Sequence, residues 1–327
     1  MSAPVPARGG RQTRSRRGPD TRVSVVVLTH DRPDELITTL ARMHKLTERP
    51  PISVIDNASR EPLHNALERQ FPEVGYVRLP ENIGAAARNQ GVEAARTPYV
   101  ALCDDDTWWE RGSLRRAANV LDAHPDVAVV CARTLVGKGS QLDPVCAAME
   151  QSPLDCTGLP GRAVLGFLAG SAVYRRSAYL GAGGFRQQFM VGGEEELMAL
   201  DLAAAGWRLA YVPEVVARHY PSPSRNPDAR RRHQLRNAVL VAWLRRPVSV
   251  AAQATARLAR QAIEDRPARL ALLDVARNGP WLFRSRRLLP ASVEADVRLL
   301  ESWTPPESED TPALAGRRDD GNSPERR

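Results

Sequence analysis

Three consecutive aspartates, Asp104–Asp106, directly follow the apolar run YVALC at residues 99–103. That run has the length and composition of a buried strand. Because side chains alternate along an extended backbone, Asp104 and Asp106 would share one side, with Asp105 on the other. Neighbouring carboxylates repel one another unless a cation is present. Their oxygens suit Mg²⁺ or Mn²⁺, although a solvated acidic turn explains the same residues.

A second acidic group, Glu194–Glu196, follows two glycines and opens a helical pattern that ends at Gly206. Carboxylates are stabilised at a helix N-terminus by the helix dipole, which accounts for one or two of the three. A carboxylate that faced a cleft would instead be a candidate general base, able to take a proton from a substrate hydroxyl.

The segments before the aspartates alternate between strand and helix patterns. Apolar, strand-like runs at residues 23–29, 52–56, 76–79 and 99–103 are separated by helical patterns at 31–46, 62–70 and 84–96. This order predicts an α/β fold with a parallel sheet covered on both faces. Ligands bind beyond the carboxyl ends of such strands. Three polar clusters fall there: Thr29–Arg32, Asp56–Ser59 and Asp104–Asp106.

Several segments of the chain resemble a known family. VVVLTHDRPDEL, VIDNAS and LPENIGAAARNQGVEAARTPYVALCDDD are similar to the nucleotide-sugar half of inverting glycosyltransferases of family 2. The segment from AGSAV to RHYPS resembles the acceptor half, so the resemblance covers roughly residues 22–225. It implies a GT-A (Rossmann-like) fold with a mostly parallel sheet flanked by helices. The helical patterns beyond residue 225 add a helical C-terminal extension to this fold. The implied activity is metal-dependent, inverting transfer of a sugar from a nucleotide-diphosphate sugar to an acceptor hydroxyl.

The resemblance assigns roles residue by residue. Mg²⁺ or Mn²⁺ would be held by Asp104, Asp106 and His219. Asp56 would contact the base or ribose of the nucleotide, or else only form an Asx-turn. Arg88 would contact the diphosphate, or else be an exposed helical arginine. Gly170 would let the backbone approach the donor sugar, or else be a turn glycine. The full set expected around the donor is Thr29, Arg32, Asp56, Asn57, Asn82, Gly84, Arg88, Asp104, Asp105 and Gly170. Trp108 and Trp109 would form either a sugar-stacking platform or core.

The base of the family falls on Glu195, from the thirteen-residue spacing between Gly193 and Gly206. Three departures from the family pattern leave Glu194 as the alternative. Glutamate stands where aspartate is commoner, Leu197 where the family often has a further aspartate, and Asp201 where it often has arginine.

The 327-residue chain carries a formal net charge of +8. Its basic first segment contains no apolar signal region, no run is long and apolar enough to span a membrane, and four cysteines show no CxxC spacing. We therefore expect a reduced, cytoplasmic protein. The expected divisions are disordered tails at 1–21 and 304–327, a glycosyltransferase domain at 22–225 with halves 22–106 and 107–225, and an extension at 226–303.

The extension is basic, with amphipathic helical patterns at 248–278 and 286–301. Packing on the catalytic domain, homodimer formation and docking on the inner face of the cell membrane all fit this pattern. The acceptor would be a glycan, a lipid-linked sugar or a small molecule. A catalytically silent nucleotide-sugar-binding or scaffold protein of the same fold is the alternative function. We expect no nucleic-acid partner, because only 5% of residues are aromatic and no RNA-recognition motif is visible.

Overall fold

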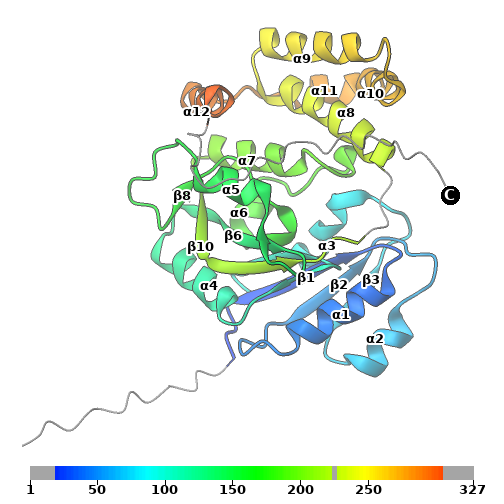
Figure 1. Ribbon diagram of the computed structural model, residues 1–327, viewed down its shortest axis with the longest axis vertical. Helices are drawn as coiled ribbons and strands as arrows, with labels where there is room; N and C mark the ends of the chain where they lie inside the picture. The colour runs from blue at the N-terminus through cyan, green and yellow to red at the C-terminus, as the bar shows by residue number, and fades with distance from the viewer. Residues whose placement is uncertain (1–18, 223–226, 305–327) are drawn as a thin grey trace, which may run out of the picture.

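A single mixed sheet forms the centre of the molecule (Figure 1). The computed structural model describes residues 19–222 and 227–304. The strand order is β3-β2-β1-β4-β9-β6-β10-β5, with β7 paired to β6 and β8 to β10. The strands are β1 (Val23–Thr29), β2 (Ile52–Asp56), β3 (Gly75–Arg78), β4 (Tyr99–Asp104), β5 (Thr107–Trp109), β6 (Val127–Val136), β7 (Gln141–Leu142), β8 (Arg162–Ala163), β9 (Ala172–Arg175) and β10 (Arg208–His219).

The first four strands of the path are parallel, as the alternating pattern predicts. In their register, Thr29 lies opposite Asp56, and Leu28 lies opposite Asp104. The carboxyl ends of β1, β2 and β4 therefore meet at one edge of the sheet. Beyond β4 the sheet is mixed, because β9 runs antiparallel between β4 and β6, and β5 runs antiparallel to β10.

Helices cover both faces of the sheet and bury two apolar cores. On one face, α1 (Pro33–Met43), α2 (His64–Gln70) and α4 (Ser113–Ala123) contribute side chains such as Leu36, Leu67 and Leu114. On the other face lie α3 (Arg88–Ala94), α5 (Pro144–Glu150), α6 (Arg176–Gly181) and α7 (Glu194–Ala204). This two-sided burial explains why the strand sequences are almost continuously apolar.

The C-terminal part is a layer of helices over α7, drawn in yellow and orange in Figure 1. It comprises α8 (Pro227–Arg245), α9 (Val248–Gln261), α10 (Arg266–Arg277), α11 (Gly279–Ser285) and α12 (Ala291–Ser302). Met198 and Leu202 of α7 face the sheet, whereas Leu197 and Leu200 pack against the C-terminal helices in a third core. The C-terminal helices and the part of the chain that contains the sheet are thus joined through one helix that is buried on both sides.

Several predicted elements differ from the structure in their bounds. The pattern at 84–96 begins as a short 3-10 helix, Gly84–Ala87, and only then becomes α3. The helix expected over 248–278 is broken into α9 and α10, because Pro267 cannot continue a helix from the preceding turn. The long strand β10 is irregular, because its pairing with β6 shifts at a bulge between Val212 and Val216.

The tails expected at residues 1–21 and 304–327 lie almost entirely outside the described residues. Within the described part, no helix combines the length and apolar composition needed to cross a membrane. The division of the chain into domains stays a prediction.

An ion pair fastens the extension to α7. Arg245 of α8 and Asp201 of α7 are joined by two hydrogen bonds, one of them 3.0 Å long from Nη2 to Oδ2. The two side chains are 8% and 15% exposed, so the charges are largely removed from water. This pair gives a structural reason for an aspartate at position 201.

We expect Asp201→Ala to destabilise the protein by about 3 kcal/mol, because it leaves the Arg245 guanidinium buried without its counter-ion. Urea unfolding followed by circular dichroism measures the effect. The matched control is Asp126→Ala, which removes the exposed partner of Arg208 and should cost less than about 1 kcal/mol. Equal losses in the two variants would contradict the structural role of the Arg245–Asp201 pair.

Candidate functional site

The three polar clusters expected at the sheet edge lie together in the structure. The Asp31 N–H donates to Ser59 Oγ at 2.9 Å, which joins the ends of β1 and β2. The Thr29 hydroxyl donates to Asp105 Oδ2 at 2.9 Å, which joins the ends of β1 and β4. Asp31 and Ala58 both have positive φ angles, 55° and 61°, a costly conformation for non-glycine residues that is common at functional sites.

The alternation expected for the three aspartates is wrong, because the backbone turns at Asp105 and Asp106 between β4 and β5. Asp105 and Asp106 both face Arg32, whose Nη1 lies 3.2 Å from Asp105 Oδ1 and 3.6 Å from Asp106 Oδ2. Asp104 points elsewhere, and its side chain is 39% exposed. It is therefore the most accessible carboxylate of the three.

Asp105 is buried, and its environment favours the protonated form. Burial raises its pKa to about 7, although the positive charge of Arg32 opposes the rise. The Thr29 and Arg32 hydrogen bonds use both carboxylate oxygens. Asp105 therefore has a structural role, in which it connects Thr29 and Arg32 to the end of β4.

Asp106 is also buried but is surrounded by donors. His219 Nε2 lies 3.5 Å from Asp106 Oδ1, and the Ser222 N–H donates to Oδ2 at 3.3 Å. Burial alone would raise the pKa of Asp106, but the interactions with His219, Ser222 and Arg32 lower it below the usual value. The antiparallel pairing of β5 with β10, which sets Thr107 opposite His219, brings the histidine to the end of β4.

Asp104 forms an ion pair with Arg88, the first residue of α3. Arg88 is 6% exposed, so it is not the exposed helical arginine considered as an alternative. Burial lowers the pKa of Arg88, but the negative charges of Asp104, Glu194 and Glu195 raise it overall, so the guanidinium stays charged. Gly170 lies against Asp104, since a Cβ there would come within 2.6 Å of Oδ2.

Glu194 and Glu195 begin α7 and differ in their surroundings. Glu194 is 4% exposed, and its Oε2 has no hydrogen-bond partner in the described part of the chain. Burial, followed by the charge of Glu195, raises its pKa to about 8. Glu195 is half-buried, and its Oε1 accepts a 3.4 Å hydrogen bond from the Ala169 N–H. Because Ala169 precedes Gly170, Glu195 approaches the same short segment as Asp104.

Asp56 and Asn57, at the end of β2, stabilise the loops at the carboxyl edge of the sheet. Asp56 is fully buried, accepting from the Ser59 N–H at 2.8 Å and from the Tyr76 hydroxyl at 2.6 Å. The first bond closes the loop after β2 from the N–H three residues on, one residue further than in the Asx-turn considered as the alternative. Asn57 holds the loop at Asn82–Gly84, since its Oδ1 accepts from the Ile83 N–H and its Nδ2 donates to Asn82 Oδ1, both at 2.9 Å.

Segment Phe189–Gly193, just before the glutamates, has a strained backbone. Met190 has φ 60° and ψ −75°, and the Val191 N–H donates to Phe189 O at 2.7 Å, which is a rare γ-turn. On one side, Met190 O accepts from the Ala85 N–H at 2.6 Å. A Cβ at Gly84 would lie 2.0 Å from this oxygen, so only glycine fits there.

On its other side, the same segment is held by α8. Asn237 is fully buried, and its Nδ2 donates to Phe189 O at 2.9 Å, to Val191 O at 3.1 Å and to Gly192 O. Arg236 Nη2 donates to Phe189 O at 2.7 Å. The role of these two residues could not be predicted from the sequence, because an asparagine within a basic helical pattern belongs to no motif. They fix the loop that leads into the two glutamates.

Trp108 and Trp109 are buried, so they form core rather than a stacking platform. The Arg42 guanidinium lies 4.2 Å from the centre of the Trp108 ring and covers it. A pocket of about 510 Å³ beside them is lined by Arg42, Lys45, Leu46, Trp108, Trp109, Glu110, Arg111, Arg218 and Tyr220.

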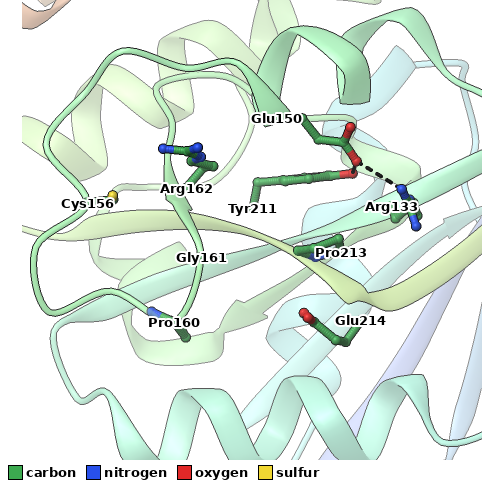
Figure 2. A pocket seen from close by; sticks show the side chains of 9 residues that line it. All are labelled: Arg133, Glu150, Cys156, Pro160, Gly161, Arg162, Tyr211, Pro213 and Glu214. Carbon is green, nitrogen blue, oxygen red and sulfur yellow. Dashed lines mark hydrogen bonds and ion pairs between the residues drawn. The ribbon is translucent and has the colours of Figure 1, made fainter.

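A second pocket, of about 690 Å³, opens at the β10 bulge (Figure 2). Glu150 there accepts from Tyr211 at 2.8 Å and from Arg133 at 3.2 Å, so much of its polar lining is already paired. Neither pocket contains Asp104, Asp106, Glu195 or His219. The chemistry of the sheet edge, rather than the size of a cavity, therefore identifies the candidate site.

The donors at this edge suit a divalent ion that is shared with a phosphate ligand. Asp104, Asp106 and His219 offer carboxylate oxygens and an imidazole nitrogen, which Mg²⁺ and Mn²⁺ accept. Among the described residues, no three histidine, cysteine or acidic side chains gather closely enough to hold a metal ion by themselves. Additional ligands would thus have to come from the bound substrate, as is usual for Mg²⁺.

Comparison with protein families supports this interpretation of the sheet edge. Residues 24–180 match the family described as "Glycosyl transferase family 2". The match covers β1 to α6 and ends before Glu194, Glu195 and His219. Sequence similarity extends to "Uncharacterized glycosyltransferase YwdF" of Bacillus subtilis, 29% identical over 116 residues, which cover 33% of this chain and 43% of that protein. The chain thus spans less than half of the length of YwdF.

A second relative is the "N-acetylglucosaminyl-diphospho-decaprenol L-rhamnosyltransferase" of Mycobacterium tuberculosis. It is 25% identical over 243 residues, which cover 62% of this chain and 78% of that protein.

Solved structures share the fold. The mannosyltransferase PcManGT of Pyrobaculum calidifontis, in complex with GDP-Man and Mn²⁺, has a TM-score of 0.51 at 20% identity, covering 87% of this chain and 88% of its own. GalNAc-T7 with UDP, GalNAc and Mn²⁺ has a TM-score of 0.54 at 16% identity, covering 68% and 48%. The S. aureus TarS fragment 1–349 has a TM-score of 0.52 at 14% identity, covering 78% and 71%. The fold is therefore of the GT-A type, as expected.

Asn237→Ala should loosen segment Phe189–Gly193. The substitution removes an amide group whose two N–H donors contact three carbonyl oxygens, and each full hydrogen bond contributes about 1 kcal/mol. We expect amide hydrogen exchange at Ala85 and Val191, whose N–H groups bond within this contact, to accelerate by about tenfold or more. The control is Asn278→Ala, which removes an asparagine–carbonyl bond inside the extension and should leave these amides unchanged. Unaltered protection in Asn237→Ala would contradict the positioning role.

Proposed function

We propose that this chain, a glycosyltransferase whose residues 24–180 form a family 2 domain, inverts the anomeric carbon as it transfers a sugar. The donor would be a nucleotide-diphosphate sugar and the acceptor a hydroxyl group. The observation that carries the proposal is the meeting of two acidic groups at segment Ala169–Gly170. Asp104 lies against Gly170, and Glu195 is hydrogen-bonded to Ala169. A cation-binding carboxylate and a candidate base thereby flank one short stretch of backbone.

The donor would bind across the carboxyl edge of the parallel strands. Arg32 and Arg88 supply fixed positive charge beside Asp104–Asp106, where a diphosphate would lie. Asn57, Asn82 and Gly84 would shape the side of this site that faces the nucleoside, while Asp56 would act through the turn that it stabilises. The proposal draws support from PcManGT, with GDP-Man, and from GalNAc-T7, with UDP.

Asp104, Asp106 and His219 would hold Mg²⁺ or Mn²⁺. When bound, the ion would neutralise the charge that develops on the departing nucleoside diphosphate. Mn²⁺ in the complexes of PcManGT and GalNAc-T7 supports a divalent metal. Asp104 is the accessible carboxylate of the three aspartates, while Asp106 orients His219 through their 3.5 Å contact.

Glu195 would act as the general base. It is more accessible than Glu194, and its tie to Ala169 directs it to the donor-sugar side of the site. Taking the proton from the acceptor hydroxyl would let the oxygen attack the anomeric carbon opposite the leaving diphosphate, so the configuration inverts in one displacement. Burial and the charge of Glu195 raise the pKa of Glu194 to about 8, which disfavours a second negative charge beside Glu195.

The acceptor would be lipid-linked. The Mycobacterium tuberculosis relative is named for a decaprenol-linked diphospho-sugar acceptor, and it matches 62% of this chain. Enzymes that use such acceptors must reach a membrane surface. We therefore propose that the protein acts in the cytoplasm, as a peripheral protein on the inner face of the cell membrane.

Asp104→Asn and Asp106→Asn should each weaken Mn²⁺-dependent binding of a nucleoside diphosphate by at least about tenfold, because each removes a negatively charged oxygen donor. Isothermal titration with UDP and GDP, with and without Mn²⁺, measures this. Asp122→Asn, at an exposed carboxylate on α4, is the control and should bind as the wild type does. Unchanged metal dependence in both site variants would remove the metal assignment.

Glu195→Gln should retain donor binding but lose turnover by about 100-fold or more, the scale expected for losing a general base. The same isosteric substitution at the neighbouring residue, Glu194→Gln, should reduce turnover less. Release of nucleoside diphosphate during transfer is the measurement. A larger loss in Glu194→Gln would move the base to Glu194, whereas metal-dependent binding without turnover in the wild type would favour a silent binding protein.

A further inference from the structure

The most exposed apolar side chains of the described structure belong to the extension. Five large apolar residues are more than half exposed: Val248 (60%), Ile263 (74%), Leu273 (53%), Phe283 (87%) and Leu288 (62%). All five lie between α9 and the segment after α11. An exposed phenylalanine is costly in water, and the concentration of exposed apolar residues in one stretch of the chain indicates an interaction surface.

Arginines accompany these residues. On α10, Arg266, Arg269, Leu273 and Arg277 are all exposed, and their spacing of three or four residues places them on one face of the helix. Phe283 and Arg284 on α11, followed by Arg287 and Leu288, repeat the combination. We call this set, together with Ile263, the basic–apolar surface. Within the described residues, Arg266, Arg284 and Arg287 make no ion pair with an acidic side chain.

Two of the four acidic residues in 227–290 pair with arginines of α8. Asp274 is 7% exposed and binds Arg232 of α8 at 2.6 Å, and Asp265 binds Arg231 of α8 at 3.1 Å. The other two, Asp228 and Glu264, are exposed. Residues 227–290 contain fourteen arginines and four acidic residues, a formal net charge of +10, whereas the whole chain has +8. The positive charge of the protein is thus concentrated in the extension.

We propose that the basic–apolar surface docks on an anionic phospholipid membrane. Apolar side chains that enter the headgroup region, surrounded by arginines that pair with lipid phosphates, are the combination found in interfacial helices. The proposal rests on the proposed function only for the reason a membrane is needed, namely a lipid-linked acceptor. It assigns membrane contact to a particular set of residues.

Two other occupants fit the surface less well. A second copy of the chain would bring together two regions that each carry a net charge of +10, which repel one another. A nucleic acid would pair with the arginines, but it would give the apolar side chains of Phe283 and Leu288 little apolar surface to contact. A membrane satisfies the charge and the apolar side chains together.

Docking at this surface would also fix the position of the catalytic helix. In Figure 1, α8 lies between α7 and α9, so the extension bridges the surface and the glutamates. The connection is stiff, because Arg245 pairs with Asp201 and Asn237 holds the loop before α7. A docked extension would hold Glu195 at a set height above the lipid.

Vesicle co-sedimentation of the full chain tests the proposal. Vesicles of phosphatidylglycerol and phosphatidylcholine in equal parts should bind the protein, and pure phosphatidylcholine vesicles should bind it much less. Phe283→Ser/Leu288→Ser should weaken binding by about tenfold or more. Val77→Ser/Val145→Ser, at exposed apolar positions of the catalytic half, is the matched control and should bind as the wild type does.

A second pair of variants tests the charge. Arg266→Gln/Arg284→Gln should weaken binding to the anionic vesicles more strongly than Arg69→Gln/Arg96→Gln, which removes the same charge from the catalytic half. Equal effects of the two pairs, or binding that survives Phe283→Ser/Leu288→Ser, would overturn the proposal. Loss of a dimer in light scattering of Phe283→Ser/Leu288→Ser, without a change in vesicle binding, would assign the surface to a second copy.

The outcome is separable from that of the proposed function. Vesicle binding needs no turnover, so it can succeed where sugar transfer fails. Conversely, all four variants should keep metal-dependent binding of UDP or GDP, because none of the altered residues is among those proposed to bind the donor or the metal. A variant that loses nucleoside diphosphate binding along with vesicle binding would indicate damage to the fold, and circular dichroism of that variant identifies it. Docking is overturned if Phe283→Ser/Leu288→Ser and Arg266→Gln/Arg284→Gln fold properly and still bind vesicles as the wild type does.

Discussion

The strained turn at Met190 is the constraint on which the site depends. Its backbone conformation is unfavourable, so it persists only because the surroundings hold it. The Ala85 N–H binds Met190 O from the nucleotide half of the sheet, and Asn237 binds the neighbouring carbonyls from the extension. Three parts of the chain that are far apart in sequence thus meet in one short segment. The position of the first turn of α7, and of both glutamates, follows from that meeting.

Electrostatic balance around Arg88 is the second organising feature. This buried guanidinium pairs with Asp104 and is stabilised in its charged form by Glu194 and Glu195 as well. One cation therefore serves three carboxylates, and burial raises the pKa of both glutamates. The deficit of positive charge suits a site that is completed by an added cation. It also keeps the two acidic groups within one electrostatic unit, although they belong to different halves of the domain.

Much of the fold could be predicted from the sequence, because the parallel strands are apolar on both faces and the helices between them are periodic. The three clusters at the strand ends were found for the same reason, since parallel strands bring their ends together. The turn at Asp105 and Asp106 could not be predicted, because alternation assumes that an extended backbone continues. Asn237 and Arg236 were out of reach as well. Their function depends on tertiary contacts with backbone carbonyl oxygens. Every residue has such an oxygen, so the sequence does not indicate which ones are contacted.

The two-sided burial of α7 has a consequence for the evolution of this protein. Leu197 and Leu200 would be exposed without the extension, so the catalytic half and the C-terminal helices cannot be separated as independent modules. Recombination between β10 and α8 would join an α7 to an α8 that lacks the matching Asn237 and Arg245. Both segments must then be inherited together, and substitutions on one should be followed by compensating substitutions on the other. Variation in the C-terminal helices among relatives would accordingly alter the geometry of the site from outside the recognised family domain.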